Sequence, residues 1–256
     1  MDLLQIQPFD TLIIIVAFLI GGFVKGVVGV ALPMLAMAIL TMFYSVPLAV
    51  SLITIPTLSA NIYQAIRPGE MQPDETMAAI RRFWPLLVTL VPGIGLGTAF
   101  LATLSSSYLM GCLGIAILVA VGFQIVRPEH PIPHSIEKWA SPIIGTVSGL
   151  VGGVAGLYGP LMAVYMSGLR MPRNTFICSI SIANVAGSLP LTLFIYFRGI
   201  ADLQLLAVSL IATVPMFAGL IAGQRARHLI NAHVFYRLLQ IVLVIAGINF
   251  LRNSFS

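Results

Sequence analysis

The sequence predicts an all-α polytopic membrane protein built from two inverted-topology repeats, each a re-entrant helical hairpin plus three transmembrane helices. Three observations predict this fold class. The 256 residues are 59% hydrophobic and 8% charged, a glycine–proline motif is duplicated, and equivalent loops carry opposite charge bias. Soluble domains carry roughly a quarter charged residues. The composition therefore excludes a soluble enzyme, a disordered chain and a nucleic-acid-binding protein.

Apolar runs long enough to cross a bilayer follow one another along the chain. A bilayer core about 30 Å thick needs roughly 20 apolar residues per helix, and residues 11–66 contain a single charge, Lys25. The other charges fall mostly in short breaks, so the net charge of +5 indicates membrane orientation rather than a polyanionic partner. Cys112 and Cys178 lie inside apolar runs, and we expect two buried thiols without a disulfide.

The chain contains an internal repeat with an offset of 126 to 127 residues. A glycine–proline motif of the first half recurs without gaps in the second half, and so does a later pair of glycines. The matching segments are Gly22-x3-Gly26-x2-Gly29-x3-Pro33 with Gly149-x3-Gly153-x2-Gly156-x3-Pro160, and Gly93-x3-Gly97 with Gly219-x3-Gly223. We interpret the later glycine pairs as close helix contacts, because small residues four apart let two backbones approach.

Equivalent loops of the two copies differ in charge. In the first copy the basic residues gather before Phe83, whereas in the second they gather near Met171 and His228. Basic residues mark the cytoplasmic side, so we predict that the copies are inserted upside down relative to each other. Inversion requires an odd number of crossings per copy. The first apolar segment of each copy is therefore predicted to be a re-entrant hairpin with two arms of about 14 residues, with eight plain helices kinked at prolines as the alternative.

The predicted boundaries place one repeat in each half of the chain. The first repeat, 1–128, holds a hairpin over 11–43 and helices over 47–66, 83–104 and 107–127. Residues 129–138 are predicted to be a cytoplasmic linker. The second repeat, 139–256, holds a hairpin over 140–168 and helices over 174–197, 203–224 and 234–252.

The glycine–proline motif is predicted to lie at the tip of each hairpin, near the bilayer midplane. Non-helical backbone at that depth needs protein or a water-filled cavity to satisfy its polar groups. Pro33 and Pro160 suit the first turn of a helix, so the second arm of each hairpin would begin at the tip. Its unpaired N–H groups and positive dipole end would then point to the bilayer centre. Two such helix ends facing each other predict an oxyanion site.

Polar side chains near these tips are the predicted ligand contacts. Lys25 has no acidic residue at its depth, so an anionic substrate is its predicted counter-charge, the alternative being a lysine that snorkels to the interface. Asn61 and Asn184 are predicted at the site, single Ser and Thr residues as links between helices, and Tyr158 as a donor or a plug of the tip. The predicted substrate-binding residues are Lys25, Gly29, Val30, Ala31, Leu32, Pro33, Asn61, Gly156, Leu157, Tyr158, Gly159, Pro160 and Asn184.

In their order and duplication these motifs resemble the TauE/SafE sulfite exporter family, also called the toluene sulfonate uptake permeases. The resemblance rests on the duplicated motif, on "MFYSVPLAVSLITIP" and "RMPRNTFICSISIAN" after it, and on the turns "IRPGEMQ" and "YFRGIAD". It covers nearly the whole chain. It implies a bacterial or archaeal plasma-membrane permease for sulfite, sulfonates or related organosulfur anions. The first tip, "GVALP", has fewer glycines than many family members.

The expected function is a multi-pass plasma-membrane permease or exporter for sulfite or small organosulfonate anions, with access alternating as one repeat rocks against the other. We expect no catalytic residue, metal or cofactor, and the expected partners are the small anion and the lipid bilayer, with a homodimer left open. The alternatives are a permease for another small anion or for a cation or metal, and an intramembrane enzyme. No acidic residue or histidine lies inside an apolar run, so we expect downhill transport without proton coupling.

Overall fold

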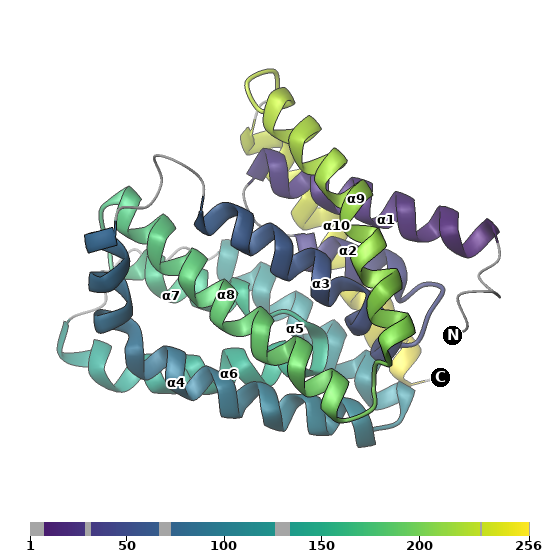
Figure 1. The fold of residues 1–256 in the computed structure, drawn as a ribbon, viewed down its shortest axis with the longest axis horizontal. Helices are drawn as coiled ribbons and strands as arrows, with labels where there is room; N and C mark the ends of the chain where they lie inside the picture. Colours follow the sequence, from purple (N-terminus) through teal and green to yellow (C-terminus); the bar gives the residue numbers. More distant parts are fainter. Residues whose placement is uncertain (1–7, 29–31, 67–72, 126–133, 231, 256) are drawn as a thin grey trace.

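The computed structural model describes residues 8–28, 32–66, 73–125, 134–230 and 232–255, which form ten helices and no strand (Figure 1). Five of these helices, α1, α3, α4, α8 and α9, are long and apolar enough to cross a membrane. The predicted all-α membrane fold is confirmed. The helices are α1 (Pro8–Val28), α2 (Leu32–Leu40), α3 (Val46–Ala65), α4 (Pro73–Thr103), α5 (Ser106–Ile125), α6 (His134–Ala155), α7 (Gly159–Gly168), α8 (Arg173–Phe197), α9 (Leu203–Ala226) and α10 (Ala232–Ser254).

The two segments predicted as hairpins are each a long helix followed by a short one. Helices α1 and α6 have 21 and 22 residues, and α2 and α7 have 9 and 10. The expectation of two arms of about 14 residues each is therefore wrong. The long arms continue past the apolar runs because their first turns hold Asp10 and Glu137, and a carboxylate stabilises a helix N-terminus. The last residues of the predicted linker 129–138 are accordingly helical, and 129–133 lie outside the described residues.

In each of these two segments, the region where the long helix begins lies next to the region where the short helix ends. The Tyr44 hydroxyl, just after α2, donates to the Asp10 carboxylate at 2.9 Å. The Tyr165 hydroxyl, near the end of α7, lies 2.7 Å from Ser141 Oγ near the start of α6. Burial and the Asp10 carboxylate both raise the pKa of Tyr44, so its hydroxyl remains a donor at physiological pH. Both segments thus fold back on themselves.

The two halves of the chain interlock. Helix α1 packs along α9 of the other half, and its counterpart α6 packs along α4 (Figure 1). Helices α3 and α8 contact each other at the centre, and α5 packs on α10. The largest contacts between the halves have a partner contact with the roles exchanged, which is what a two-fold relation between two similar units produces.

Glycines make the close approach of α1 to α9 and of α4 to α6. A Cβ at Gly223 would lie 3.1 Å from Gly26 Cα, and one at Gly97 would lie 2.8 Å from Gly153 Cα. The prediction that the later glycine pairs are helix contacts is therefore confirmed. The placement of the whole duplicated motif at the tips is wrong, because its first two glycines lie within the long arms and face these neighbours. The glycines concerned are Gly22, Gly26, Gly149 and Gly153.

A proline inside α3 is compensated by a side chain from α9. Pro56 has no N–H, so the Leu52 carbonyl one turn earlier has no helical donor. The hydroxyl of Ser209, which is fully buried, donates to Leu52 O at 2.7 Å and accepts from Ile55 N at 3.3 Å. This contact fixes α3 against α9.

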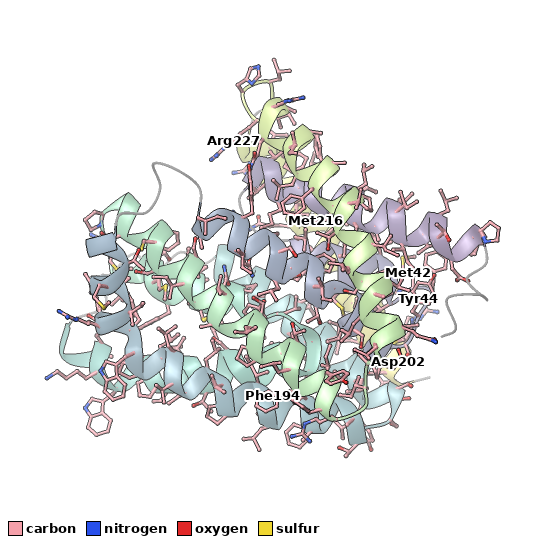
Figure 2. All side chains as sticks on the ribbon, viewed as in Figure 1. Met42, Tyr44, Phe194, Asp202, Met216 and Arg227 are labelled. Carbon is pink, nitrogen blue, oxygen red and sulfur yellow. The ribbon has the colours of Figure 1, made fainter. Side chains whose placement is uncertain are left out.

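Charged side chains lie at helix ends. Asp202 caps the start of α9 by accepting from Leu205 N at 2.7 Å, and Arg227 lies at the opposite end of that helix (Figure 2). Near the beginnings of α4 and α6, Arg82 makes a bidentate contact with Glu137, with Nε–Oε1 at 2.6 Å and Nη2–Oε2 at 2.9 Å. This ion pair ties the two helix ends together.

Candidate functional site

The chain leaves the helical conformation inside the protein between α6 and α7. Gly156 has φ of 70°, which favours glycine, and a Cβ there would lie 2.7 Å from Ile53 Cδ1. Helix α7 then begins with Tyr158 as N-cap, without a side-chain cap, and with Pro160 in its first turn. The first N–H groups of a helix have no partner within it. The start of α7 therefore offers donors and a positive dipole end to the protein interior.

Lys25 lies in the interior and does not snorkel. Its side chain is 5% exposed, and Nζ donates to Asn61 Oδ1 at 2.8 Å. Within the described ranges no carboxylate forms an ion pair with it. Among the described residues, the hydrogen-bond partner of this lysine is thus a neutral amide.

Asn61 joins this lysine to α8 of the second half. Its Nδ2 donates to the main-chain oxygen of Asn184 at 3.4 Å, and Ser188 Oγ donates to the same oxygen at 2.8 Å. The Asn184 side chain faces the start of α7, because a Cβ at Gly159 would lie 3.0 Å from Asn184 Oδ1. Residues of α1, α3, α7 and α8 therefore meet at one place.

Tyr158 lies in the same cluster, which we call the polar cluster (Lys25, Asn61, Tyr158, Asn184, Ser188). A Cβ at Gly152 would lie 2.7 Å from Tyr158 Cβ, and one at Gly187 would lie 2.8 Å from Tyr158 Cδ2, so the ring fits between two glycines. Its hydroxyl is buried near Asn61 and Ser188 at a geometry that makes no full hydrogen bond. The ring fills the tip and also presents an unused hydroxyl.

The other predicted tip residues are placed differently. Leu32 is the fully buried first residue of α2, and Pro33 follows it in the first turn. Gly29, Val30 and Ala31 lie outside the described residues. In the second tip, Leu157 lines an apolar cavity, although it neighbours the polar cluster in sequence.

Several hydroxyls of α3 and α8 are satisfied within their own helices. Ser51 Oγ donates to Pro47 O at 2.8 Å, and Thr54 Oγ1 donates to Val50 O at 2.6 Å. The interpretation of single Ser and Thr residues as links between helices therefore fails for these two. Sequence reasoning treated Ser188, like other single Ser residues of this helix, as a link between helices and did not place it beside Tyr158, although the Gly-Ser step inside an apolar run was a local signal for close packing.

The polar cluster is rich in donors. The Lys25 ammonium and the Asn61 amide donate, the Tyr158 hydroxyl and the start of α7 have donors without a full partner, and no described carboxylate forms an ion pair with Lys25. Among the described residues no group of three His, Cys, Asp or Glu could hold a metal ion. This set of side chains matches an anion.

Fold and site define a multi-pass helical membrane protein whose interior holds a donor-rich cluster shared by two interlocked halves. The chain belongs to the sulfite exporter TauE/SafE family, whose model matches residues 13–250. The suspected family is thereby confirmed over nearly the whole chain. Members are membrane transporters that export sulfite, as the family name states. No curated protein and no solved structure matches the chain.

Proposed function

We propose that this protein is a plasma-membrane permease that exports sulfite or a small organosulfonate, and that the anion binds at the polar cluster. The observation that carries the proposal is Lys25, which is buried and hydrogen-bonded to Asn61, and which forms no ion pair with a carboxylate in the part of the chain that the structure describes. A buried charge without a counter-charge is strongly destabilising. A bound anion would supply that counter-charge.

The donors match the shape of a sulfo group. Its three oxygens each accept hydrogen bonds, and three separate sources of donors surround the cluster. The Lys25 ammonium has donors left after its bond to Asn61, the Tyr158 hydroxyl has no full partner, and α7 begins with unpaired N–H groups. Hydrogen bonds from such groups to an anion are about twice as strong as neutral ones.

We further propose that the two hairpins enter the membrane from opposite sides. The contact of Tyr44 with Asp10 lies where α3 begins, and the contact of Tyr165 with Ser141 lies near the ion pair of Glu137 with Arg82, in the first third of α4. The 20-residue helix α3 separates these two ends of the molecule. Arg81, Arg82 and Lys138 gather at the second end, which supports a cytoplasmic position for it.

Anion binding to purified protein tests the proposal. Sulfite or methanesulfonate should raise the melting temperature in a concentration-dependent way, because a ligand that binds only the folded state stabilises it. Lys25→Met should lose this shift and lose sulfite efflux from proteoliposomes. Tyr63→Phe, on a ring that packs against Phe217 at 5.5 Å, is the matched control and should retain both. Equal shifts with chloride, or an unchanged shift in Lys25→Met, would contradict the proposal.

Transport driven by the membrane potential follows from the absence of an acidic side chain in the polar cluster. Export of one negative charge is favoured by roughly 2.3 kcal/mol per 100 mV, interior negative. Efflux of a fixed-charge sulfonate should therefore rise with an imposed potential and leave the lumenal pH unchanged. Acidification of the lumen in step with sulfonate flux would show proton coupling instead.

A further inference from the structure

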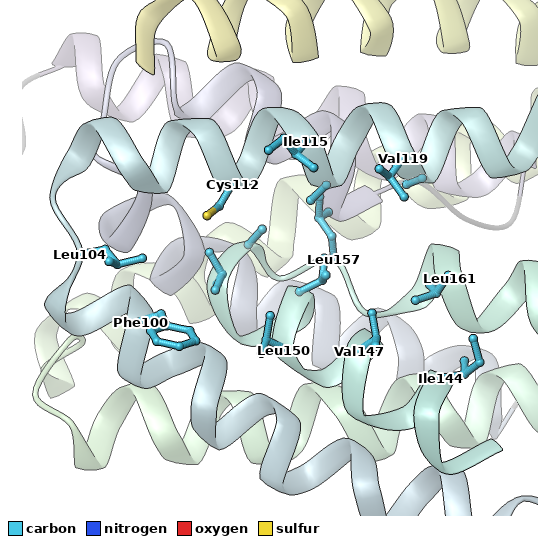
Figure 3. Close-up of a pocket in the computed structure, with 15 residues that line it drawn as sticks. Phe100, Leu104, Cys112, Ile115, Val119, Ile144, Val147, Leu150, Leu157 and Leu161 are labelled. Carbon is cyan, nitrogen blue, oxygen red and sulfur yellow. The ribbon is translucent and has the colours of Figure 1, made fainter. Parts of the chain in front are cut away.

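An apolar cavity of about 630 Å³ lies between α5 and the second hairpin. Figure 3 shows Cys112, Ile115 and Val119 of α5 on one side of it, Leu150 of α6 on the other, and Leu157 of the α6–α7 break between them. The lining side chains are apolar apart from the Cys112 thiol. This cavity is separate in chemistry from the polar cluster.

The cavity opens toward the outside of the helix bundle. Its rim includes Ile115 and Val119, which are 55% and 47% exposed, whereas Leu157 on its floor is 2% exposed. Cys112 is also exposed, so the expectation of two buried thiols is wrong for this one and holds for Cys178. Helices of a membrane transporter expose such apolar side chains to lipid. The mouth of the cavity is therefore continuous with the lipid-facing surface.

Three of the lining positions have larger side chains at the equivalent positions of the other half. At the repeat offsets, Leu150 corresponds to Phe23 and Ala116 to Val242, while Cys112 corresponds to Leu238. The Phe23 ring packs edge-on against Phe235, with ring centroids 6.4 Å apart. At these three positions the larger side chains lie on α1 and α10, and the smaller ones line the cavity.

We propose that this cavity binds one hydrocarbon chain of a bilayer lipid. An empty space of this size would forfeit the dispersion contacts of its walls. Dry apolar cavities of about 150 Å³ already bind benzene, and this one is roughly four times larger. Acyl chains are the hydrocarbon that the bilayer supplies at the mouth. This proposal does not depend on the identity of the transported anion.

The bound chain would pack against the second tip. Leu157 and Leu161 both line the cavity and flank Tyr158 and Gly159 in sequence. A chain in the cavity therefore supports the backbone that presents the Tyr158 hydroxyl and the start of α7 to the polar cluster.

Photolabelling of the full protein tests the lipid site. The protein is reconstituted in phosphatidylcholine vesicles that contain phosphatidylcholine with a diazirine on one acyl chain, irradiated, and mapped by mass spectrometry. We expect label on Leu157, which surface lipid cannot reach, as well as on Ile241, which is 56% exposed on α10. Label on Ile241 without any on Leu157 would overturn the proposal.

A variant in which larger side chains fill the cavity provides the second part of the test. The double variant Ala116→Val with Leu150→Phe copies the larger residues of the other half and should lower label on Leu157 at least tenfold, with label on Ile241 unchanged. Ile248→Phe, on the exposed face of α10, is the matched control. If the double variant does not fold, Cys112→Leu serves in its place. Unchanged label in a folded filled variant, or displacement of label from Leu157 by millimolar methanesulfonate, would overturn the assignment to lipid.

Discussion

At the scale of single residues, the polar cluster shows what a membrane sequence reveals and what it hides. Lys25, Asn61 and Tyr158 could be named from the sequence because polar side chains inside apolar runs are rare and need partners. Their contacts could not be named. Asn61 accepts from Lys25 and donates to the main chain of Asn184, and this depends on how α3 crosses α8. The fit of the Tyr158 ring between Gly152 and Gly187 depends on how α6 packs against α8.

Removal of the Tyr158 hydroxyl should weaken anion binding without loss of stability. Tyr158→Phe keeps the ring between the two glycines, and the hydroxyl has no full hydrogen bond to lose in the empty protein. A hydrogen bond to a charged group contributes about 1.5–3 kcal/mol, so affinity for sulfite should fall about 10- to 100-fold. Melting-temperature titrations measure this change, with Tyr63→Phe as control. Wild-type affinity in Tyr158→Phe would place the hydroxyl outside the site.

At the scale of helices, hydropathy located the spans but missed the beginning of α4. The helix predicted to begin at 203 begins at Leu203, whereas the helix predicted to begin at 83 begins ten residues earlier, at Pro73. The extra turns of α4 carry charges, which hydropathy reads as a break although they continue the helix outside the apolar zone. The break between α6 and α7 was visible because Gly156 and Pro160 each disfavour continuous helix there. The sequence contains no comparable signal for the unequal lengths of the two helices in each hairpin.

The hydroxyl of Ser209 should contribute to stability through the broken turn of α3. Ser209→Ala leaves the buried Leu52 carbonyl without a donor, which costs about 1–3 kcal/mol. Thermal and denaturant unfolding in detergent should show this loss. Thr213→Val is the matched control, because Thr213 donates only within α9, to Ser209 O at 3.4 Å, and it should change stability by less than about 0.5 kcal/mol. Equal effects of the two variants would refute a special role for Ser209.

The glycine contact of α1 with α9 should tolerate no side chain. A Cβ at Gly223 would meet the main chain of Phe23 and Gly26 on α1, which cannot move aside as a flexible side chain can. Gly223→Ala should therefore destabilise the protein by about 1–3 kcal/mol, the usual range for overpacking. Gly122→Ala on α5 is the control, because a Cβ there meets nothing within 4 Å and should be neutral or stabilising. The melting temperatures of the two variants in detergent provide the comparison.

At the scale of the whole molecule, the repeat predicts which helices correspond and leaves open which ones touch. The offset pairs α1 with α6 and α4 with α9 as equivalents, and the structure packs α1 on α9 and α6 on α4. Each long arm is thus held by the opposite half. The glycine pairs at matching offsets contained this information, because the two members of a close helix contact must both be small. The smaller residues at Cys112, Ala116 and Leu150 are visible in the sequence, but the cavity could not be predicted without the packing of α5 against the second hairpin.

The proposed inversion makes an accessibility prediction at this scale. In a protein with Cys112 and Cys178 replaced by alanine, Met42→Cys at the end of the first hairpin should react with a membrane-impermeant maleimide in intact cells. Arg170→Cys at the end of the second hairpin should react only after permeabilisation, because that end gathers the basic residues that mark the cytoplasm. Both positions are exposed, Met42 at 68%, so burial would not explain a failure to react.

Two positions flanking α9 calibrate the assay independently of the hairpins. Leu203→Cys and Leu229→Cys are 69% and 77% exposed at opposite ends of a helix that is long enough to cross the membrane. Leu203→Cys should label like Met42→Cys, and Leu229→Cys like Arg170→Cys. Eight plain kinked helices would give each half an even number of crossings, and Met42 and Arg170 would then label from the same side. That result would contradict the proposed inversion of the hairpins. It would also contradict the meeting of two helix ends from opposite leaflets, but it would not affect the hydrogen bond between Lys25 and Asn61.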